Sequence, residues 1–186
     1  MRIFFVVFSF FFLVSCSLPG TQTETSVDSA SADNTTQFKN DSITISVPKS
    51  WTQAKPNEIP TPRHGSIEVA YISPDMKYGF SNNFIVMKDA LNSIVTSAKY
   101  SELNNLQTSR NYLEYTKLQD TEFTFSDSET SRLYVFEARY NQTTPKMKFI
   151  QIARVCGSHV YLLHVSLSLD KSPDNYISLL KTFQCK

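Results

Sequence analysis

The sequence predicts an α+β fold, in which an antiparallel sheet of about six to seven strands is flanked by helices. Three features lead to this prediction. Apolar and polar residues alternate along several segments, which is the period of a half-buried strand. Gly157-Ser158 separates two long alternating segments and suits a two-residue hairpin turn. Two other segments carry apolar residues at helical spacing, so helices are expected to cover the sheet.

The first half of the folded part is expected to supply three strands. One runs from Phe38 to Val47, where alternate residues are apolar, and Pro48 ends it. Trp51, the only tryptophan, is expected to fill the core rather than to bind a ligand. The second and third strands are expected from Gly65 to Ser73 and from Asn83 to Lys88.

A helix is expected next, from about Ser97 to Leu113, with Thr96 as its N-cap. Leu103, Leu106 and Leu113 form a narrow apolar stripe at helical spacing. The rest of the helix is polar, so the stripe is expected to face the sheet and the helix to cover one side of it.

Four long strands and a second helix complete the chain. In the last strand alternate residues share one face, whereas Leu162 and His164 point to the other, so both faces of the sheet are expected to be at least partly covered. The residues of the first face are Tyr161, Leu163, Val165, Leu167 and Leu169. Ser172-Pro173-Asp174 is expected to start a helix, with Ser172 as the N-cap, Pro173 at the first position and Asp174 in the first turn. The strands are expected at Glu114 to Phe125, Arg132 to Tyr140, Met147 to Cys156 and His159 to Leu169, and the helix stripe is Tyr176, Leu179, Leu180 and Phe183.

The N-terminus has the pattern of an export signal. A basic start at Arg2 precedes the apolar run Ile3 to Val14, which is about 18 Å long as a helix and shorter than the roughly 30 Å hydrocarbon core of a bilayer. Leu13-Val14-Ser15-Cys16 resembles the bacterial lipobox, in which the cysteine thiol is acylated and becomes the first residue. We therefore expect a signal peptide at 1–15 and a lipid on Cys16. An ordinary cleavage site with Cys16 as a spare thiol is the alternative.

This anchor predicts a location and a domain organisation. The lipid would hold the protein on the extracytoplasmic face of the cell membrane. Residues 16–37 are rich in Ser and Thr and contain no basic or aromatic residue, so they are expected to form a flexible linker. Residues 38–186 are then one globular domain.

Composition and residue spacing argue against nucleic-acid binding, metal binding and catalysis. The chain has 18 basic and 17 acidic side chains and no basic run, so nucleic acid is not an expected partner. His64, His159 and His164 lack metal-ligand spacing, and Asp120, Asp127 and Glu129 lack the order of a calcium loop. No nucleophile elbow or phosphate loop occurs, so we expect no metal site, no cofactor and no catalytic residue.

Two cysteines remain beside the anchor, Cys156 and Cys185. An exported domain favours a disulfide between them. Geometry opposes it, since the last strand would run about 33 Å away from Cys156 and the last helix would return only about 18 Å. The bridge forms only if the strand is shorter than expected or if the chain after Phe183 extends backward. Both outcomes stay open at this point.

Six short segments, in this order along the chain, suggest a known family. They are Ile45-Ser46-Val47-Pro48-Lys49-Ser50-Trp51, Tyr100-Ser101-Glu102-Leu103-Asn104, Tyr115-Thr116-Lys117-Leu118, Phe149-Ile150-Gln151-Ile152, Val160-Tyr161-Leu162-Leu163 and Leu180-Lys181-Thr182-Phe183. With the order of elements, they resemble the PsbP-type domain, an antiparallel sheet sandwiched by helices. Members of that family include photosystem II extrinsic subunits and many bacterial lipoproteins of unknown role, and the fold carries no catalytic motif. The resemblance therefore implies a non-catalytic protein and transfers no site residue.

Two classes of function follow. The first is a membrane-anchored binding or assembly module that docks on an unknown protein partner in the envelope, with Tyr134, Tyr140 and Tyr161 as candidate contact residues on a sheet face. The second is an envelope hydrolase or small-ligand carrier. A deep pocket with converging acids or histidines would favour the second class, and a filled core with an exposed apolar patch would favour the first.

Overall fold

The structure is a computed structural model that describes residues 34–55, 59, 62, 64–77 and 79–186. The predicted signal peptide, Cys16 and most of the predicted linker lie outside the described residues. The folded part begins earlier than expected, because Thr35–Lys39 form a strand that pairs with Ile43–Pro48. Strand β1 is held by backbone hydrogen bonds to β2, which do not depend on apolar side chains. The composition of the segment therefore gives no sign that the folded domain begins before Phe38.

The elements form two antiparallel sheets and two helices. The large sheet has seven strands in the order β3-β4-β5-β9-β8-β7-β6, and the small sheet has three in the order β1-β2-β10. The predicted α+β architecture is confirmed, and the small sheet is an addition to it. In chain order the elements are β1 Thr35–Lys39, β2 Ile43–Pro48, β3 Thr52–Gln53, β4 Ser66–Lys77, β5 Phe80–Ala90, α1 Ser97–Asn111, β6 Leu113–Thr124, β7 Thr130–Arg139, β8 Met147–Cys156, β9 His159–Leu167, α2 Asp174–Leu180 and β10 Gln184–Cys185.

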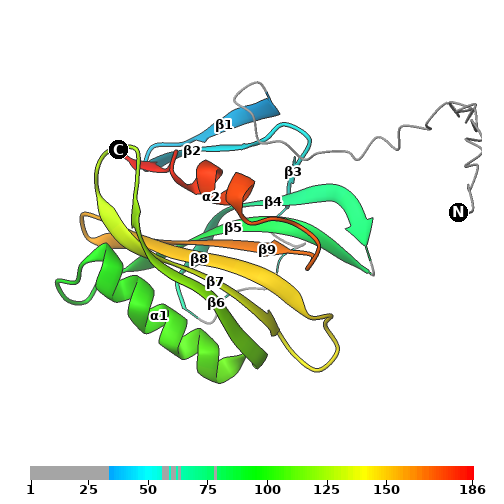
Figure 1. Ribbon diagram of the computed structural model, residues 1–186. Helices are drawn as coiled ribbons and strands as arrows, with labels where there is room; N and C mark the ends of the chain where they lie inside the picture. The colour runs from blue at the N-terminus through cyan, green and yellow to red at the C-terminus, as the bar shows by residue number, and fades with distance from the viewer. Residues whose placement is uncertain (1–33, 56–58, 60–61, 63, 78) are drawn as a thin grey trace, which may run out of the picture.

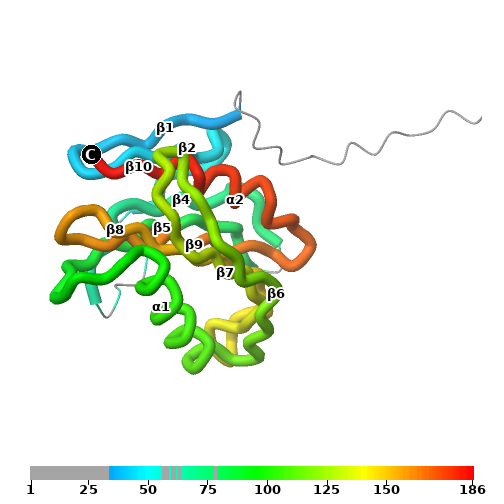
Figure 2. Tube along the Cα trace, turned by 60° about the vertical axis from the view of Figure 1, so that its left-hand side comes forward, coloured from blue at the N-terminus to red at the C-terminus, as the bar shows by residue number. Residues whose placement is uncertain are grey.

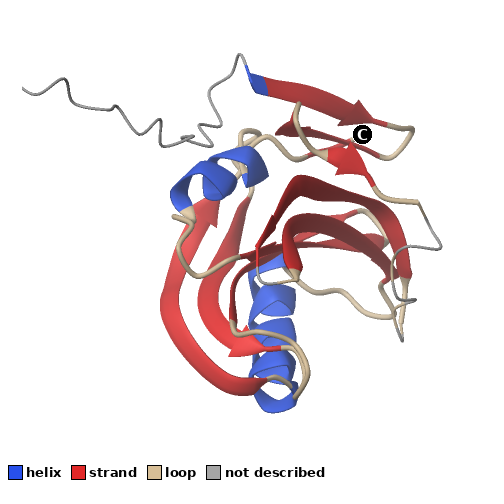
Figure 3. Cartoon of the chain, turned by 90° about the vertical axis from the view of Figure 1, so that its right-hand side faces the viewer, coloured by secondary structure: helices blue, strands red, loops and turns tan. Residues whose placement is uncertain are grey.

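The two faces of the large sheet are covered by different layers. Helix α1 lies along one face, and α2 with the small sheet lies on the opposite side (Figure 1). The view in Figure 3 shows how strongly the large sheet curls between these two layers. No helix in the part of the chain that the structure describes is long and apolar enough to cross a bilayer.

The expected strand from Phe38 to Val47 is a hairpin. It reverses at Asn40, whose side-chain oxygen accepts hydrogen bonds from the backbone N–H groups of Ser42 and Ile43, both at 2.9 Å. This local turn lets β1 fold back on β2, with Phe38 opposite Ile45. The alternation of apolar residues in the sequence belongs to β2 alone.

The later strands follow the predicted positions closely. Strand β8 has the predicted bounds, and Gly157 adopts a φ of 60° in the two-residue turn that leads to β9. Cys156 and His159 are the last pair before this turn, which confirms the predicted hairpin. Strand β9 ends at Leu167, two residues before the expected end, and Leu169 is exposed.

The main core lies between the large sheet and the layer of α2 and β2. Trp51 is buried there with its ring 5.7 Å from that of Tyr176, so its predicted core role is confirmed. The second helix is shorter than expected, because it ends at Leu180 while the fully buried Phe183 lies in the chain beyond it. Its N-cap is Pro173 and not Ser172. Figure 2 shows the chain returning from α2 as β10, which pairs with β2 on the side opposite β1.

Candidate functional site

Helix α1 meets the sheet through polar side chains. Its buried residues are Ser97, Ser101, Asn105 and Thr108. The expectation that the leucine stripe faces the sheet is therefore wrong: Leu103, Leu106 and Leu113 are 50%, 47% and 41% exposed.

A split in the sheet explains this arrangement. Strands β7 and β8 pair only from Ala138–Met147 up to Tyr134–Gln151, and the backbone groups beyond that point need other partners. The Ser101 hydroxyl donates to the Arg132 carbonyl at 2.5 Å and accepts from the Ala153 N–H at 3.3 Å, while the Ser97 hydroxyl accepts from the Val155 N–H at 3.0 Å. The helix thus completes the hydrogen bonding of the sheet with serines, which an apolar side chain cannot do.

Because the polar side of α1 faces the sheet, an apolar surface is left on the outer side of the helix. Leu103 and Leu106 are three residues apart and so share one face of the helix. Two basic residues flank these leucines on the same face: Lys99 lies four residues before Leu103, and Arg110 lies four residues after Leu106. We call the face formed by these four residues the outer face of α1. Beyond the end of the helix, Leu113, Leu118 and Tyr140 add further exposed apolar area.

Of the three tyrosines expected on an exposed sheet face, only Tyr140 is exposed, at 56%. Tyr134 is buried in the cluster of apolar residues on the α1 side of the sheet. Tyr161 is buried on the other side, with its ring 5.6 Å from that of Phe183. The expectation for Tyr134 and Tyr161 is therefore wrong, since both faces of the sheet are covered.

The histidines of β9 point to different environments. His164 is buried on the α1 side, where Gln151 Nε2 lies 3.0 Å from its Nδ1. Burial lowers the pKa of His164 to about 4. His159 lies at the hairpin turn beside Ser158, and His64 is exposed. The structure therefore does not bring the three histidines together.

The acidic residues considered as a calcium cluster are bound to basic side chains. Asp127 and Glu129 lie 2.7 and 3.5 Å from the guanidinium of Arg154, which is nearly buried over the Phe125 ring. Asp120 pairs with Lys117 at 2.8 Å and with Arg132, and these two hydrogen bonds lower the pKa of its carboxyl. Among the described residues no three His, Cys, Asp or Glu side chains are grouped to hold a metal ion.

The structure joins Cys156 and Cys185 in a disulfide, with their Cα atoms 5.8 Å apart. Strand β9 is shorter than expected, and the chain after Phe183 runs back as β10 beside β2. Both conditions that the geometry imposed on the bridge are met. The bond ties the small sheet to the end of the β8–β9 hairpin.

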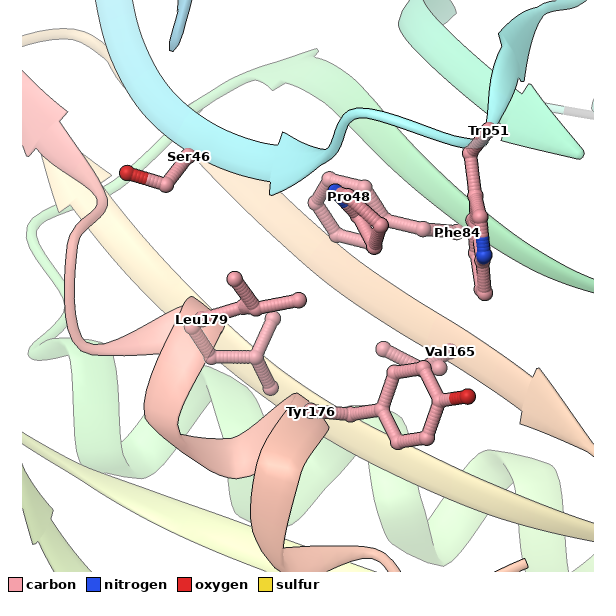
Figure 4. Close-up of a pocket in the computed structure, with 8 residues that line it drawn as sticks. Ser46, Pro48, Trp51, Phe84, Val165, Tyr176 and Leu179 are labelled. Atoms are coloured by element: carbon pink, nitrogen blue, oxygen red, sulfur yellow. The ribbon is translucent and has the colours of Figure 1, made fainter. Parts of the chain in front are cut away.

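The space between α2, β2 and the large sheet is nearly filled. Figure 4 shows Trp51, Phe84, Val165, Tyr176 and Leu179 converging on a small apolar cavity. Its volume is about 10 Å³, roughly the room of one water molecule. No titratable acid or histidine lines it, and it offers no space for a substrate.

Comparison with known proteins places the fold. No family model and no curated protein matches the chain. The solution structure of cyanobacterial PsbP from Synechocystis sp. PCC 6803 superposes with a TM-score of 0.58 and covers 90% of this chain and 98% of its own. The fold is PsbP-like. Sequence identity in this comparison is only 8%, so the likeness concerns the fold alone.

A second solved structure is also similar in fold to this chain. A crystal structure of a protein of unknown function from Pseudomonas aeruginosa matches with a TM-score of 0.51 and 10% identity, over 78% of this chain and 90% of that protein. The PsbP-like arrangement expected from the order of elements is thus confirmed, and the functional assignment depends on the residues of this chain.

Proposed function

We propose that this protein is a lipid-anchored, non-catalytic binding or assembly module on the extracytoplasmic face of the cell membrane, which docks a protein partner on the outer face of α1. One observation carries the proposal: α1 attaches to the sheet by serines and turns its leucines to solvent. Single exposed leucines are common, but here the apolar side of a helix is left uncovered. Covering Leu103 and Leu106 would recover about 1 kcal/mol for each half-exposed side chain.

The charges on this face favour a partner of another kind over a second copy. If two α1 helices packed antiparallel around Leu103 and Leu106, Lys99 of one copy, which pairs with its own Glu102 at 3.0 Å, would lie opposite Arg110 of the other, so the two copies would gain no ion pair from these positions. A protein surface with apolar residues bordered by acidic ones complements this face better. The filled core also favours this function over an envelope hydrolase or carrier, which would need converging acids or histidines in a deep pocket.

Replacing Leu103 and Leu106 together by glutamate should remove partner binding. Both side chains point away from the sheet, so the fold should tolerate the change. We expect proteins that cross-link to and co-purify with the wild type from membranes to fall about tenfold or more with the double variant.

A matched control adds the same charge away from the apolar surface. Thr52→Glu with Gln53→Glu places two acids at exposed positions of β3, at the opposite edge of the large sheet from β6, and should retain the partner. Equal recovery of every co-purified protein with the leucine variant and with this control would show that the outer face of α1 is not the docking site.

The anchor rests on the residues Leu13-Val14-Ser15-Cys16 and has its own test. Cys16→Ala should abolish incorporation of a radiolabelled fatty acid, because only the thiol of this cysteine is the expected acyl acceptor. Cys156→Ala with Cys185→Ala is the control and should leave the label unchanged. Label that persists in the Cys16→Ala protein would contradict lipid attachment at this residue.

A further inference from the structure

Strand β6 forms one edge of the large sheet, since it is the last strand in the sheet order and β7 is its one partner strand among the described residues. Its final half, from Gln119 to Thr124, pairs with β7 without interruption, whereas a register shift lies between Lys117 and Gln119. An edge strand presents backbone N–H and C=O groups that no neighbouring strand uses. The final half of β6 is therefore a regular strand with one open side.

The hydrogen bond that closes the β6–β7 turn shows which residues face outward. The N–H of Phe125 donates to the Glu129 carbonyl at 2.9 Å, so Phe125 directs its backbone groups towards β7. In an antiparallel pair, residues that direct their backbone groups inward alternate with residues that direct them outward. The backbone N–H and C=O groups of Asp120, Glu122 and Thr124 therefore point away from β7.

The next outward group along the chain already has a backbone partner. The Ser126 N–H, which follows Thr124 in the alternation, donates to the Lys181 carbonyl at 2.9 Å. A chain that lies beside this edge can therefore form hydrogen bonds to it. Lys181 limits the open stretch at one end, and the register shift after Lys117 limits it at the other. Between these limits, the open stretch has room for about five residues of an added strand.

The side chains of this stretch indicate which residues an added strand would carry. Glu122 is exposed and has no ion-pair partner among the described residues, and Arg132, opposite it on β7, binds Asp120 instead. A basic residue beside Glu122 would supply the missing opposite charge. Phe123 and Thr121 point to the other face of the sheet, where Phe123 belongs to the main core. Apolar residues beside these two would extend that core.

We propose that the edge of β6 from Asp120 to Thr124 binds an extended segment of a protein partner. The segment adds as an antiparallel strand, with a lysine or arginine opposite Glu122 and a β-branched apolar residue on either side of it. In this mode of recognition backbone hydrogen bonds supply the affinity and alternate side chains supply the specificity. The site is separate from the outer face of α1 and goes beyond the proposed function.

The charges disfavour a second copy of this chain as the added strand. If two β6 edges paired antiparallel about Thr121 or about Glu122, Glu122 of one copy would lie opposite Asp120 or Glu122 of the other. Like charges directly opposite each other destabilise a strand pair. The next register along separates these acids but places Ser126 opposite Asp120 of the other copy, and the Ser126 N–H is already bonded to Lys181. A segment with a basic residue at its centre meets neither obstacle.

The test uses the peptide Thr-Val-Lys-Val-Thr, acetylated and amidated at its ends, and the full chain purified from membranes into phosphatidylcholine nanodiscs. Saturation-transfer NMR, which observes the peptide, should show saturable binding after the signal of empty nanodiscs is subtracted. N-methylation of the peptide lysine removes the N–H that would donate to the Glu122 carbonyl and should weaken binding about tenfold. N-methylation of the valine that follows is the matched control. Its N–H points away from β6, so binding should be unchanged.

Two variants of the protein test the same edge. Thr124→Pro removes an outward N–H but no hydrogen bond to β7, so the edge strand should tolerate it and binding should fall about tenfold. Glu122→Lys should reverse the charge preference, so that Thr-Val-Glu-Val-Thr binds more tightly than the lysine peptide. The proposal is overturned if the wild type does not saturate, if both N-methylated peptides bind alike, or if both variants bind the lysine peptide as the wild type does. A doubled mass of the free protein that Thr124→Pro abolishes would assign the edge to a second copy instead.

Discussion

Replacing Cys156 and Cys185 together by alanine is expected to lower the free energy of unfolding by about 3 to 4 kcal/mol. The bridge joins residues 29 apart in sequence and closes a loop of the unfolded chain whose entropy the variant would regain. It also ties β10 to the β8–β9 hairpin, and β10 is an edge strand of only two residues that pairs with β2. Loss of the bond should therefore free the C-terminus first. Urea unfolding of wild type and variant, with and without reductant, measures the change.

Adding reductant to the wild type and to the alanine variant provides an internal control. Reductant should destabilise the wild type by a similar amount and should leave the alanine variant unaffected. Intact-mass analysis after alkylation without reductant should add no label to Cys156 or Cys185 in protein exported to an oxidising compartment. Two alkylated cysteines under that condition would contradict the disulfide.

The sequence predicted best where a strand is buried on both sides. Strand β8 and the hairpin at Gly157-Ser158 were placed correctly, because apolar residues continue to the turn and glycine supplies the positive φ. The lengths of β9 and α2 were overestimated, since apolar residues such as Leu169 and Phe183 continue beyond the regular elements. The spacing of apolar residues predicts which side chains are buried, but not where a helix ends. Phe183 is fully buried although it lies beyond the end of α2.

The leucine stripe of α1 lies on the opposite side from the expected one for a specific reason. Leucines at helical spacing usually face the core, but the gap between β7 and β8 needs hydroxyl groups, so Ser97 and Ser101 take the buried side of α1. A signal was present in the sequence: Ser97, Ser101, Asn105 and Thr108 are small polar residues at spacings of four, four and three. Only the pairing of the strands shows why that face is the buried one.

The short edge strands have no comparable signal. Strands β3 and β10 contain two residues each and are too short to show a period. The strand order β4-β5-β9-β8 brings segments far apart in the chain next to each other, and alternation of apolar residues does not determine that order.

Acid should destabilise the protein through His164 by about 3 kcal/mol between pH 7 and pH 4. Burial lowers the pKa of His164 to about 4, against an ordinary value of 6.5. Above pH 6.5 the imidazole is neutral in both states and has no effect on pH dependence. Below pH 6.5 the unfolded chain takes up the proton first, so stability falls by about 1.4 kcal/mol per pH unit until the folded protein also binds a proton near pH 4.

The surroundings of His164 explain why the folded protein resists this proton. Gln151 accepts a hydrogen bond from Asn104 through its oxygen, at 3.3 Å, so its NH₂ group points to the imidazole Nδ1. A proton on Nδ1 would face this donor and break the contact. His164→Leu should lower stability at pH 7 but give a flatter stability curve below pH 6.5, so its deficit relative to the wild type should shrink towards pH 4, whereas His159→Gln, at the hairpin turn, should retain the wild-type slope. Urea unfolding at pH 7, 6, 5 and 4 gives the three curves, and parallel curves for the wild type and His164→Leu would assign the acid sensitivity to other groups.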